Sequence, residues 1–260
     1  MNSTFASLKL FGFALLCALV VPFQALLLLA YKGRGTYILP HLWHKAVCAV
    51  FGIRIQMQGK AYTDSQVIYV SNHLSYLDIP ALASMICYGS FVAKKDVASW
   101  PVFGYLSKLQ QTAFVSRSRE DARKGANALA TMLKDGKNMI IFPEGTSTDG
   151  REVVPFKSSL FSIALQEEAK DLVIQPVSIE VLSANGRAPQ TQEERDLYAW
   201  HRDMDTELPE HLWRFAKTSG AVLKITFHDI VRANDFSDRK TLAKACYETV
   251  SKGLELSKAA

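Results

Sequence analysis

Acidic residues are absent from the first 63 positions of this 260-residue chain, and the first carboxylate is Asp64. Of the 30 basic residues, 6 lie in that stretch, and the other 24 face 25 acidic residues in the remainder. A basic, apolar N-terminal quarter on a nearly neutral body favours contact with an anionic membrane surface. The basic residues are too sparse for a nucleic-acid partner, so none is expected.

Cysteine is also scarce, and no pair of the four has the spacing of a metal site or a redox motif. We therefore predict free thiols in a reducing compartment. The chain has no evident internal repeat or low-complexity segment. It lacks a Gly-x-Ser-x-Gly elbow, which argues against a serine hydrolase.

Two apolar stretches open the chain. Residues 11–31 form an uncharged run of 21, long enough to cross a bilayer core. A secretory signal peptide is the competing interpretation, but no clear small-x-small cleavage site follows. Residues 38–53 show apolar positions at helical spacing and predict an amphipathic helix. We expect residues 1–52 to be membrane-associated helices, either crossing the inner membrane or lying in one leaflet, with the body on the cytoplasmic side.

Residues 53–260 alternate predicted strands with predicted helices and form the second expected domain. The expected strands cover 53–57, 67–70, 90–93, 112–115, 138–142, 172–179 and 222–231, and the expected helices cover 78–86, 100–109, 121–133, 158–168 and 238–257. Repeated strand–helix units predict an α/β fold with a mixed, largely parallel sheet flanked by helices. Sites in such sheets gather beyond the carboxyl ends of the strands.

A histidine and a carboxylate follow the predicted strand at 67–70. His73 stands five positions before Asp78, which begins a predicted helix containing Pro80. A carboxylate on one imidazole nitrogen fixes the tautomer and leaves the other nitrogen free to take a proton, which makes a general base. Taken alone, the pattern also fits a histidine that merely caps a turn.

Three later motifs decide between these interpretations. Asn72-His73-x4-Asp78 is followed by Phe-Val-Ser-Arg at 114–117, Phe-Pro-Glu-Gly-Thr at 142–146 and Ile-Gln-Pro-Val-Ser-Ile at 174–179. This order resembles the glycerolipid acyltransferase family, typified by bacterial 1-acyl-glycerol-3-phosphate acyltransferase, over roughly residues 50–230.

The resemblance implies roles for individual residues. Arg117 would bind the acceptor's phosphate, the 142–146 motif its glycerol, and residues 174–179 would line the acyl pocket. Lys157, near a predicted helix start, is a candidate second phosphate contact. The predicted substrate-binding set is Asn72, Arg117, Glu144, Gly145, Thr146 and Lys157, with His73 and Asp78 catalytic. The family usually has glycine three residues before the phenylalanine of the second motif, where this chain has Gln111.

The expected reaction is transfer of a fatty acyl group from acyl-CoA or acyl-carrier protein to 1-acyl-sn-glycerol-3-phosphate, giving phosphatidic acid. It needs neither a metal nor a bound cofactor. Residues 198–213 resemble an insertion of a proteobacterial subgroup that also contains lyso-ornithine lipid acyltransferases, so that acceptor is the alternative. A hydrolase and a non-catalytic membrane lipid-binding protein are further alternatives, although an intact His–Asp pair speaks against the latter.

Overall fold

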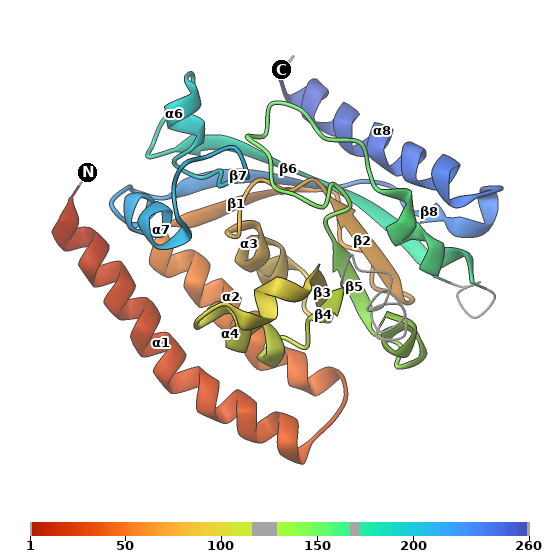
Figure 1. Cartoon of the computed structure of the whole chain (residues 1–260), viewed down its shortest axis with the longest axis horizontal. Coiled ribbons are helices and arrows are strands. Elements are labelled where there is room, and N and C mark those ends of the chain that lie inside the picture. Colours follow the sequence, from red (N-terminus) through yellow and green to blue (C-terminus); the bar gives the residue numbers. More distant parts are fainter. Residues whose placement is uncertain (1, 116–128, 167–171, 259–260) are drawn as a thin grey trace.

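The computed structural model describes residues 2–115, 129–166 and 172–258. It confirms the predicted α/β class, because the described residues form one mixed sheet flanked by helices (Figure 1). The strands follow the spatial order β1-β7-β6-β2-β5-β3-β4, and β8 pairs with β6. Their bounds are β1 Ile53–Gln58, β2 Val67–Ser71, β3 Gly89–Lys94, β4 Ala113–Val115, β5 Asn138–Ile141, β6 Val173–Ala184, β7 Ala221–Phe227 and β8 Val231–Arg232.

The sheet is parallel through its centre. β2 pairs in parallel with β5 on one side and with β6 on the other, while β7 and β8 run antiparallel to β6. All five residues of β2 are buried, as its unbroken apolar run predicts. The carboxyl ends of β2 and β5 therefore meet at one edge of the sheet, where the chain continues into residues 72 and 142.

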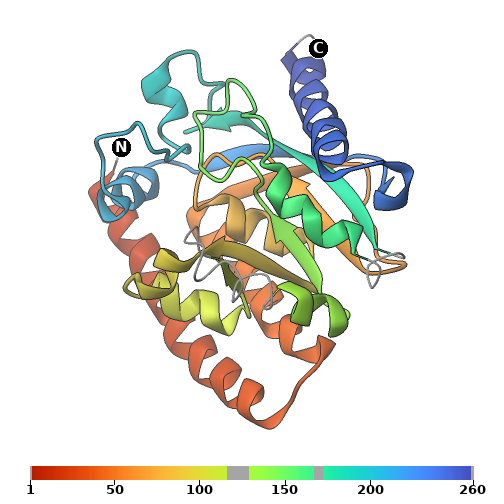
Figure 2. The same ribbon diagram turned by 45° about the vertical axis from the view of Figure 1, so that its right-hand side comes forward.

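Helices cover both faces of this sheet. The elements are α1 Ser3–Ala30, η1 Arg34–Tyr37, α2 Ile38–Phe51, α3 Asp78–Met85, η2 Lys95–Ser99, α4 Phe103–Leu109, η3 Ser158–Leu165, α6 Gln192–Arg195, α7 Leu208–Ala216, η5 Ala233–Asp235 and α8 Arg239–Lys258. Residues of α2, α3 and α7 share one buried core with the sheet, whereas α8 and η3 belong to a core on the opposite face. Figure 2 shows α1 running along the outer side of the first layer, and α8 across the other.

α1 lies against the body instead of projecting from it. Lys9 is buried, and its ammonium donates hydrogen bonds to the carbonyls of Phe51 (2.9 Å) and Thr218 (3.0 Å). Gln24, also buried, donates to the carbonyls of Thr36 (2.9 Å) and Leu109 (3.2 Å). The described residues contain one helix long and apolar enough to cross a bilayer, and it is this one. The domain boundary predicted after residue 52 stays a prediction.

Two predicted elements differ from the structure. The strand expected at 222–231 is divided into β7 and β8, because Pro176 on β6 has no N–H to continue the ladder. The register along β6 moves by one residue there, and the main-chain N–H of His228 donates to the Pro176 carbonyl at 3.0 Å. Residues 158–165 form 3₁₀ turns where an α-helix was expected over 158–168.

Candidate active site

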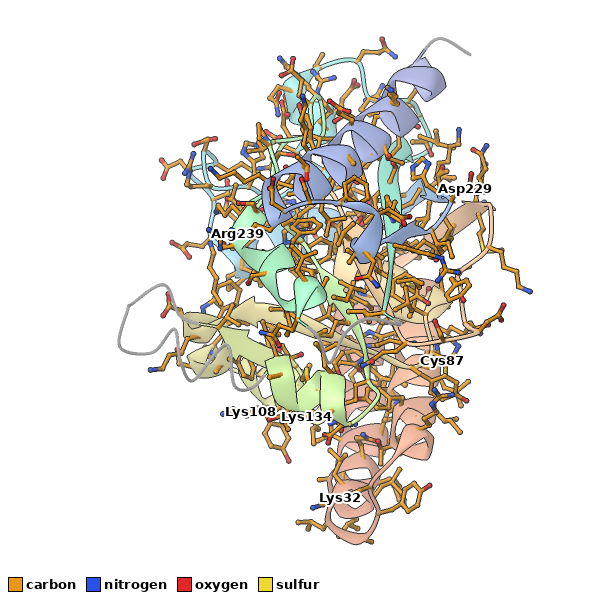
Figure 3. All side chains as sticks on the ribbon, turned by 90° about the vertical axis from the view of Figure 1, so that its right-hand side faces the viewer. Lys32, Cys87, Lys108, Lys134, Asp229 and Arg239 are labelled. Carbon is orange, nitrogen blue, oxygen red and sulfur yellow. The ribbon has the colours of Figure 1, made fainter. Side chains whose placement is uncertain are left out.

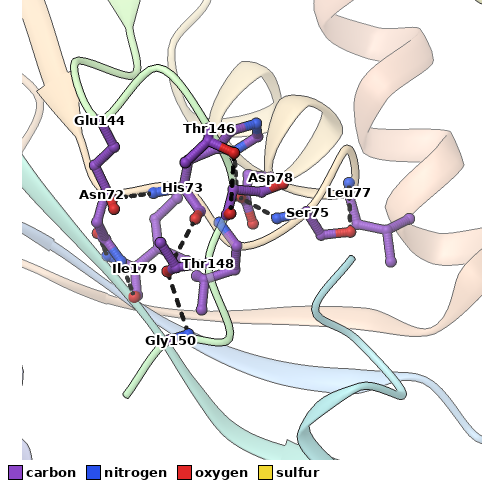
Figure 4. A network of polar contacts seen from close by, with 12 residues as sticks. Asn72, His73, Ser75, Leu77, Asp78, Glu144, Thr146, Thr148, Gly150 and Ile179 are labelled. Atoms are coloured by element: carbon purple, nitrogen blue, oxygen red, sulfur yellow. Dashed lines mark hydrogen bonds and ion pairs between the residues drawn. The ribbon is translucent and has the colours of Figure 1, made fainter. Parts of the chain in front are cut away.

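His73 and Asp78 lie in direct contact at the carboxyl end of β2. The His73 ring Nδ1 is 2.8 Å from Asp78 Oδ2 (Figure 4). The imidazole is 20% exposed, whereas the carboxylate is fully buried. Because an ionised carboxylate only accepts hydrogen bonds, it selects the tautomer with hydrogen on Nδ1. The basic Nε2 is then available to a substrate. The His73 ring also stacks on Phe142, with centroids 4.0 Å apart, which fixes its plane.

The loop between β2 and α3 is built around the Asp78 carboxylate. Oδ2 also accepts the main-chain N–H groups of Leu74 (2.6 Å) and Ser75 (2.9 Å). Asp78 is in the first turn of α3, where the helix dipole favours a negative charge. The five-residue spacing thus lets the carboxylate fold back and bind the start of its own loop and the histidine together.

Glu144, in the turn after β5, supports His73. Its Oε1 accepts the main-chain N–H of His73 at 2.8 Å, and Oε2 accepts that of Val154 at 3.0 Å. Glu144 is buried, and this burial raises the pKa of its carboxyl to about 8. Both of its carboxyl oxygens accept main-chain N–H groups. The contact of Glu144 with the acceptor's glycerol stays a prediction.

Asn72 joins two strands of the sheet. Its Oδ1 accepts the main-chain N–H of Ile179 at 2.8 Å, and its Nδ2 donates to the Ile179 carbonyl at 2.9 Å. The side chain is buried, and both ends of its amide are used within the protein. Its predicted role as a substrate contact is untested, and its described contacts connect β2 to β6 directly beneath His73.

Gly145 forms the turn after β5. Its φ is +67°, a left-handed conformation that favours glycine, and its N–H donates to the Phe142 carbonyl at 3.1 Å. A Cβ at this position would overlap the ammonium of Lys157, so the turn also lets that side chain lie close to the main chain. Thr146 is half-buried beside it. Gly145, Thr146 and Lys157 thus lie together near His73, and their substrate-binding role stays a prediction.

Arg117 lies outside the described residues, two positions after the end of β4. The departure at Gln111 can be described, and its φ is +59°. A non-glycine residue there costs about 1–2 kcal/mol of backbone strain. Its side chain donates to the Thr36 hydroxyl at 2.9 Å, and this contact offsets part of the strain. The glutamine therefore occupies the left-handed conformation that glycine prefers.

A cavity of about 570 Å³ opens beside His73. Its lining comes from α1, α2, residues 91–112, the turn at 142–147 and residues 200–212, and it is largely apolar. Trp43 of α2, Phe103 of α4 and Trp200 are among its aromatic walls. The volume is that of a small-molecule site, and the imidazole shares the wall with other polar side chains, including Lys94, Arg202 and Glu207.

Sequence reasoning missed the contribution of residues 196–216. The hydroxyl of Tyr198, a fully buried residue, donates to Asp78 Oδ1 at 2.9 Å. The main-chain N–H of Trp200 donates to the Leu74 carbonyl at 2.9 Å. The one available signal was the density of aromatic and charged residues in this stretch. That density does not identify Asp78, 120 positions earlier, as the partner of Tyr198.

Comparisons with known proteins show the family of this chain. The family model described as Acyltransferase matches residues 52–180. A lyso-ornithine lipid O-acyltransferase of Brucella abortus is 35% identical over 86% of this chain and 84% of its own length. A 1-acyl-sn-glycerol-3-phosphate acyltransferase of Neisseria gonorrhoeae is 32% identical over 71% of this chain and 68% of its own. The crystal structure of the 1-acyl-sn-glycerophosphate (LPA) acyltransferase PlsC from Thermotoga maritima shares the fold, with a TM-score of 0.74 at 21% identity over 100% of this chain and 97% of that one. The chain therefore belongs to the glycerolipid acyltransferase family.

Proposed function

We propose that this protein transfers a fatty acyl group from a thioester donor to the hydroxyl of a lysolipid, with His73 as general base. The observation that carries this proposal is the His73–Asp78 pair on the wall of an apolar cavity. Nε2 of His73 removes the proton of the acceptor hydroxyl, and the hydroxyl oxygen then attacks the thioester carbonyl. The new C–O bond forms, the C–S bond breaks, and the thiolate leaves with the proton that the imidazole took. No acyl-enzyme is required.

Asp78 stabilises the imidazolium that forms during this step. Main-chain contacts of Glu144 and Asn72 hold the segment that carries His73, so the base enters the reaction already oriented. The apolar cavity suits an acyl chain, and Lys157 lies beside the turn at Gly145, where an anionic head group would be attracted.

For the acceptor we propose lyso-ornithine lipid. The Brucella relative bearing that name matches over 86% of this chain, compared with 71% for the Neisseria relative named for 1-acyl-sn-glycerol-3-phosphate. Lysophosphatidate, the acceptor predicted from the sequence, is the second candidate. It is supported by the same motifs and by an arginine in the second motif, because guanidinium matches phosphate well. That guanidinium meets a carboxylate instead if the acceptor is lyso-ornithine lipid.

The test uses purified full-length protein in detergent, with both acceptors offered and with acyl-CoA or acyl-carrier protein as donor. His73→Ala should lower kcat by about 10²–10⁴-fold. His228→Gln is a matched control, because His228 contacts Ser178 at 2.7 Å and is not part of the cavity wall. Normal turnover by a folded His73→Ala protein would remove His73 from the mechanism. Thioester cleavage without an acceptor would make the protein a hydrolase.

We also propose that α1 lies in the plane of the membrane. Large apolar side chains are exposed at a spacing of three or four along its whole outer face: Phe5, Leu8, Phe11, Leu15, Leu19, Phe23, Leu26 and Leu29. The opposite face carries the buried, hydrogen-bonded Lys9 and Gln24. A helix that turned to cross the bilayer would take both polar groups into hydrocarbon, at a cost of several kcal/mol.

The basic turn at the end of this helix fits the same arrangement. Figure 3 shows Lys32 at the turn after α1, at one end of the molecule, with α8 at the other. A lysine there can reach anionic head groups while the outer face of α1 enters the acyl layer. We place the body on the cytoplasmic side of the inner membrane. Full-length protein that stays soluble after lysis at low salt would contradict this attachment.

A further inference from the structure

The two oxygens of Asp78 have different partners, and one of these partners lies outside the matched family region. Oδ2 accepts the ring Nδ1 of His73 and the N–H groups of the loop. Oδ1 accepts the hydroxyl of Tyr198 at 2.9 Å, the one donor to Oδ1 among the residues that the structure describes. The match to the family model ends at residue 180. We propose that Tyr198 is a positioning residue that fixes the Asp78 carboxylate and sets the proton affinity of His73.

The phenol of Tyr198 is held rigidly. The residue is fully buried, and its ring packs edge to face against Phe215 of α7, with centroids 6.0 Å apart. Nearby contacts tie the same segment to the loop around Asp78. Trp200 N–H donates to the Leu74 carbonyl, and His211 Nδ1 lies 3.0 Å from the Tyr76 hydroxyl. A fixed phenol restricts rotation of the carboxylate it binds, so Oδ2 stays aligned with the imidazole.

The hydroxyl can act only as a donor towards Asp78. Burial and the neighbouring carboxylate both raise the pKa of Tyr198 well above that of a free tyrosine, so it remains protonated. A donor on Oδ1 draws negative charge away from the carboxylate. This weakens the electrostatic stabilisation of the His73 imidazolium. Glu144, the other carboxyl in contact with His73, accepts its main-chain N–H and is the same in every variant below.

The sign of the expected effect follows directly. Removing the hydroxyl leaves more negative charge on Asp78, which raises the pKa of His73. Because only neutral His73 can accept a proton, the acidic limb of the kcat/KM profile then moves to higher pH. We expect Tyr198→Phe to move this limb upward by about one pH unit. It should also lower kcat by about tenfold through loss of alignment, within the range for a misplaced catalytic group.

Tyr69→Phe is the matched control. Tyr69 is also buried, and its hydroxyl donates to the Tyr62 carbonyl at 2.6 Å without touching Asp78. Both variants lose one buried phenol hydrogen bond, so both should lose thermal stability. Only the change at Tyr198 should move the acidic limb. If Tyr198→Phe does not fold, 3-fluorotyrosine at position 198 keeps the shape and strengthens the donor, and the limb should then move to lower pH.

This inference rests on the proposed role of His73, and the outcomes separate the two. Unmutated protein that acylates no lysolipid refutes the proposed function. The pKa of the His73 imidazole, measured by NMR in Tyr198→Phe and in unmutated protein, still tests the inference without any turnover. A His73 pKa and an acidic limb in Tyr198→Phe that equal those of Tyr69→Phe would overturn it, as would a fluorotyrosine protein with an unmoved limb.

Discussion

The side-chain amide of Asn72 binds the main chain of Ile179 with both its oxygen and its nitrogen, at 2.8 and 2.9 Å. Asn72→Ala would leave a buried N–H and a buried C=O without partners. Each orphaned group costs about 1–3 kcal/mol, so the variant should lose about 2–6 kcal/mol of its free energy of unfolding. For a chain of this size, that corresponds to a fall in Tm on the order of 10 °C.

The assay combines thermal unfolding in detergent with steady-state kinetics in which the acceptor is varied. We expect kcat to fall, because Asn72 precedes His73 and its two hydrogen bonds to Ile179 fix that end of β2. The acceptor KM should stay within about twofold, since loss of alignment acts on the chemical step and not on uniform binding.

Gln175→Ala is the matched control for this prediction. Gln175 is a buried amide on the same strand as Ile179, and it donates to the carbonyls of Lys60 (3.0 Å) and His228 (2.9 Å). Its loss should lower Tm by a similar amount and leave kcat unchanged, because no residue of 174–179, the stretch expected to line the acyl pocket, is part of the wall of the cavity beside His73. An Asn72→Ala protein with an unchanged Tm and a strongly raised acceptor KM would refute this reasoning and support the predicted substrate contact instead.

Three further predictions concern charged groups. Burial raises the pKa of Glu144 to about 8 from 4.5. The protonated carboxyl therefore stabilises the folded protein fully below pH 4.5, and this stabilisation is lost as the pH rises through 8. Glu144→Gln should therefore destabilise the protein more at pH 5 than at pH 8.5, and an equal Tm difference at both pH values would contradict this. Lys9→Met should lower Tm while vesicle binding persists. Leu19→Glu, on the exposed face of α1, should weaken flotation with vesicles and leave Tm unchanged. The opposite pattern would refute the in-plane arrangement. Arg117→Ala should raise the acceptor KM by an amount equivalent to about 1.5–3 kcal/mol and leave the donor KM unchanged, with lysine a partial substitute; an unchanged KM for both acceptors would exclude it as the head-group contact.

The predicted strands were accurate where the signal is local. Residues 67–70 are consecutive β-formers, and β2 spans Val67–Ser71. The division of the predicted strand 222–231 was not foreseen, because it depends on Pro176 in a strand some 50 positions earlier. Pairing register is set by the partner strand, and a single-sequence pattern does not specify the partner.

The candidate site divides in the same way. His73 and Asp78 stand at the two ends of one short loop, so their contact could be predicted from the five-residue spacing. The direction in which Asn72 and Glu144 point depends on main-chain partners at Ile179 and Val154, and the sequence gives no sign of either. Tyr198 shows the limit most clearly, because its hydroxyl meets a carboxylate 120 positions earlier in the chain.

The contact of Lys9 with Thr218 has a consequence for how the chain is made. These residues are 209 positions apart. The described partner of β1 is β7, which is likewise synthesised near the end of the chain. At about 5–20 residues per second, α1 leaves the ribosome roughly 10–40 s before its final partner is synthesised. During this interval Lys9 lacks its Thr218 partner, and the apolar outer face of α1 is exposed, as it remains in the folded chain. If α1 binds a bilayer as proposed, that bilayer can hold the helix until β7 is made, and the membrane would then assist folding before any lipid substrate is bound.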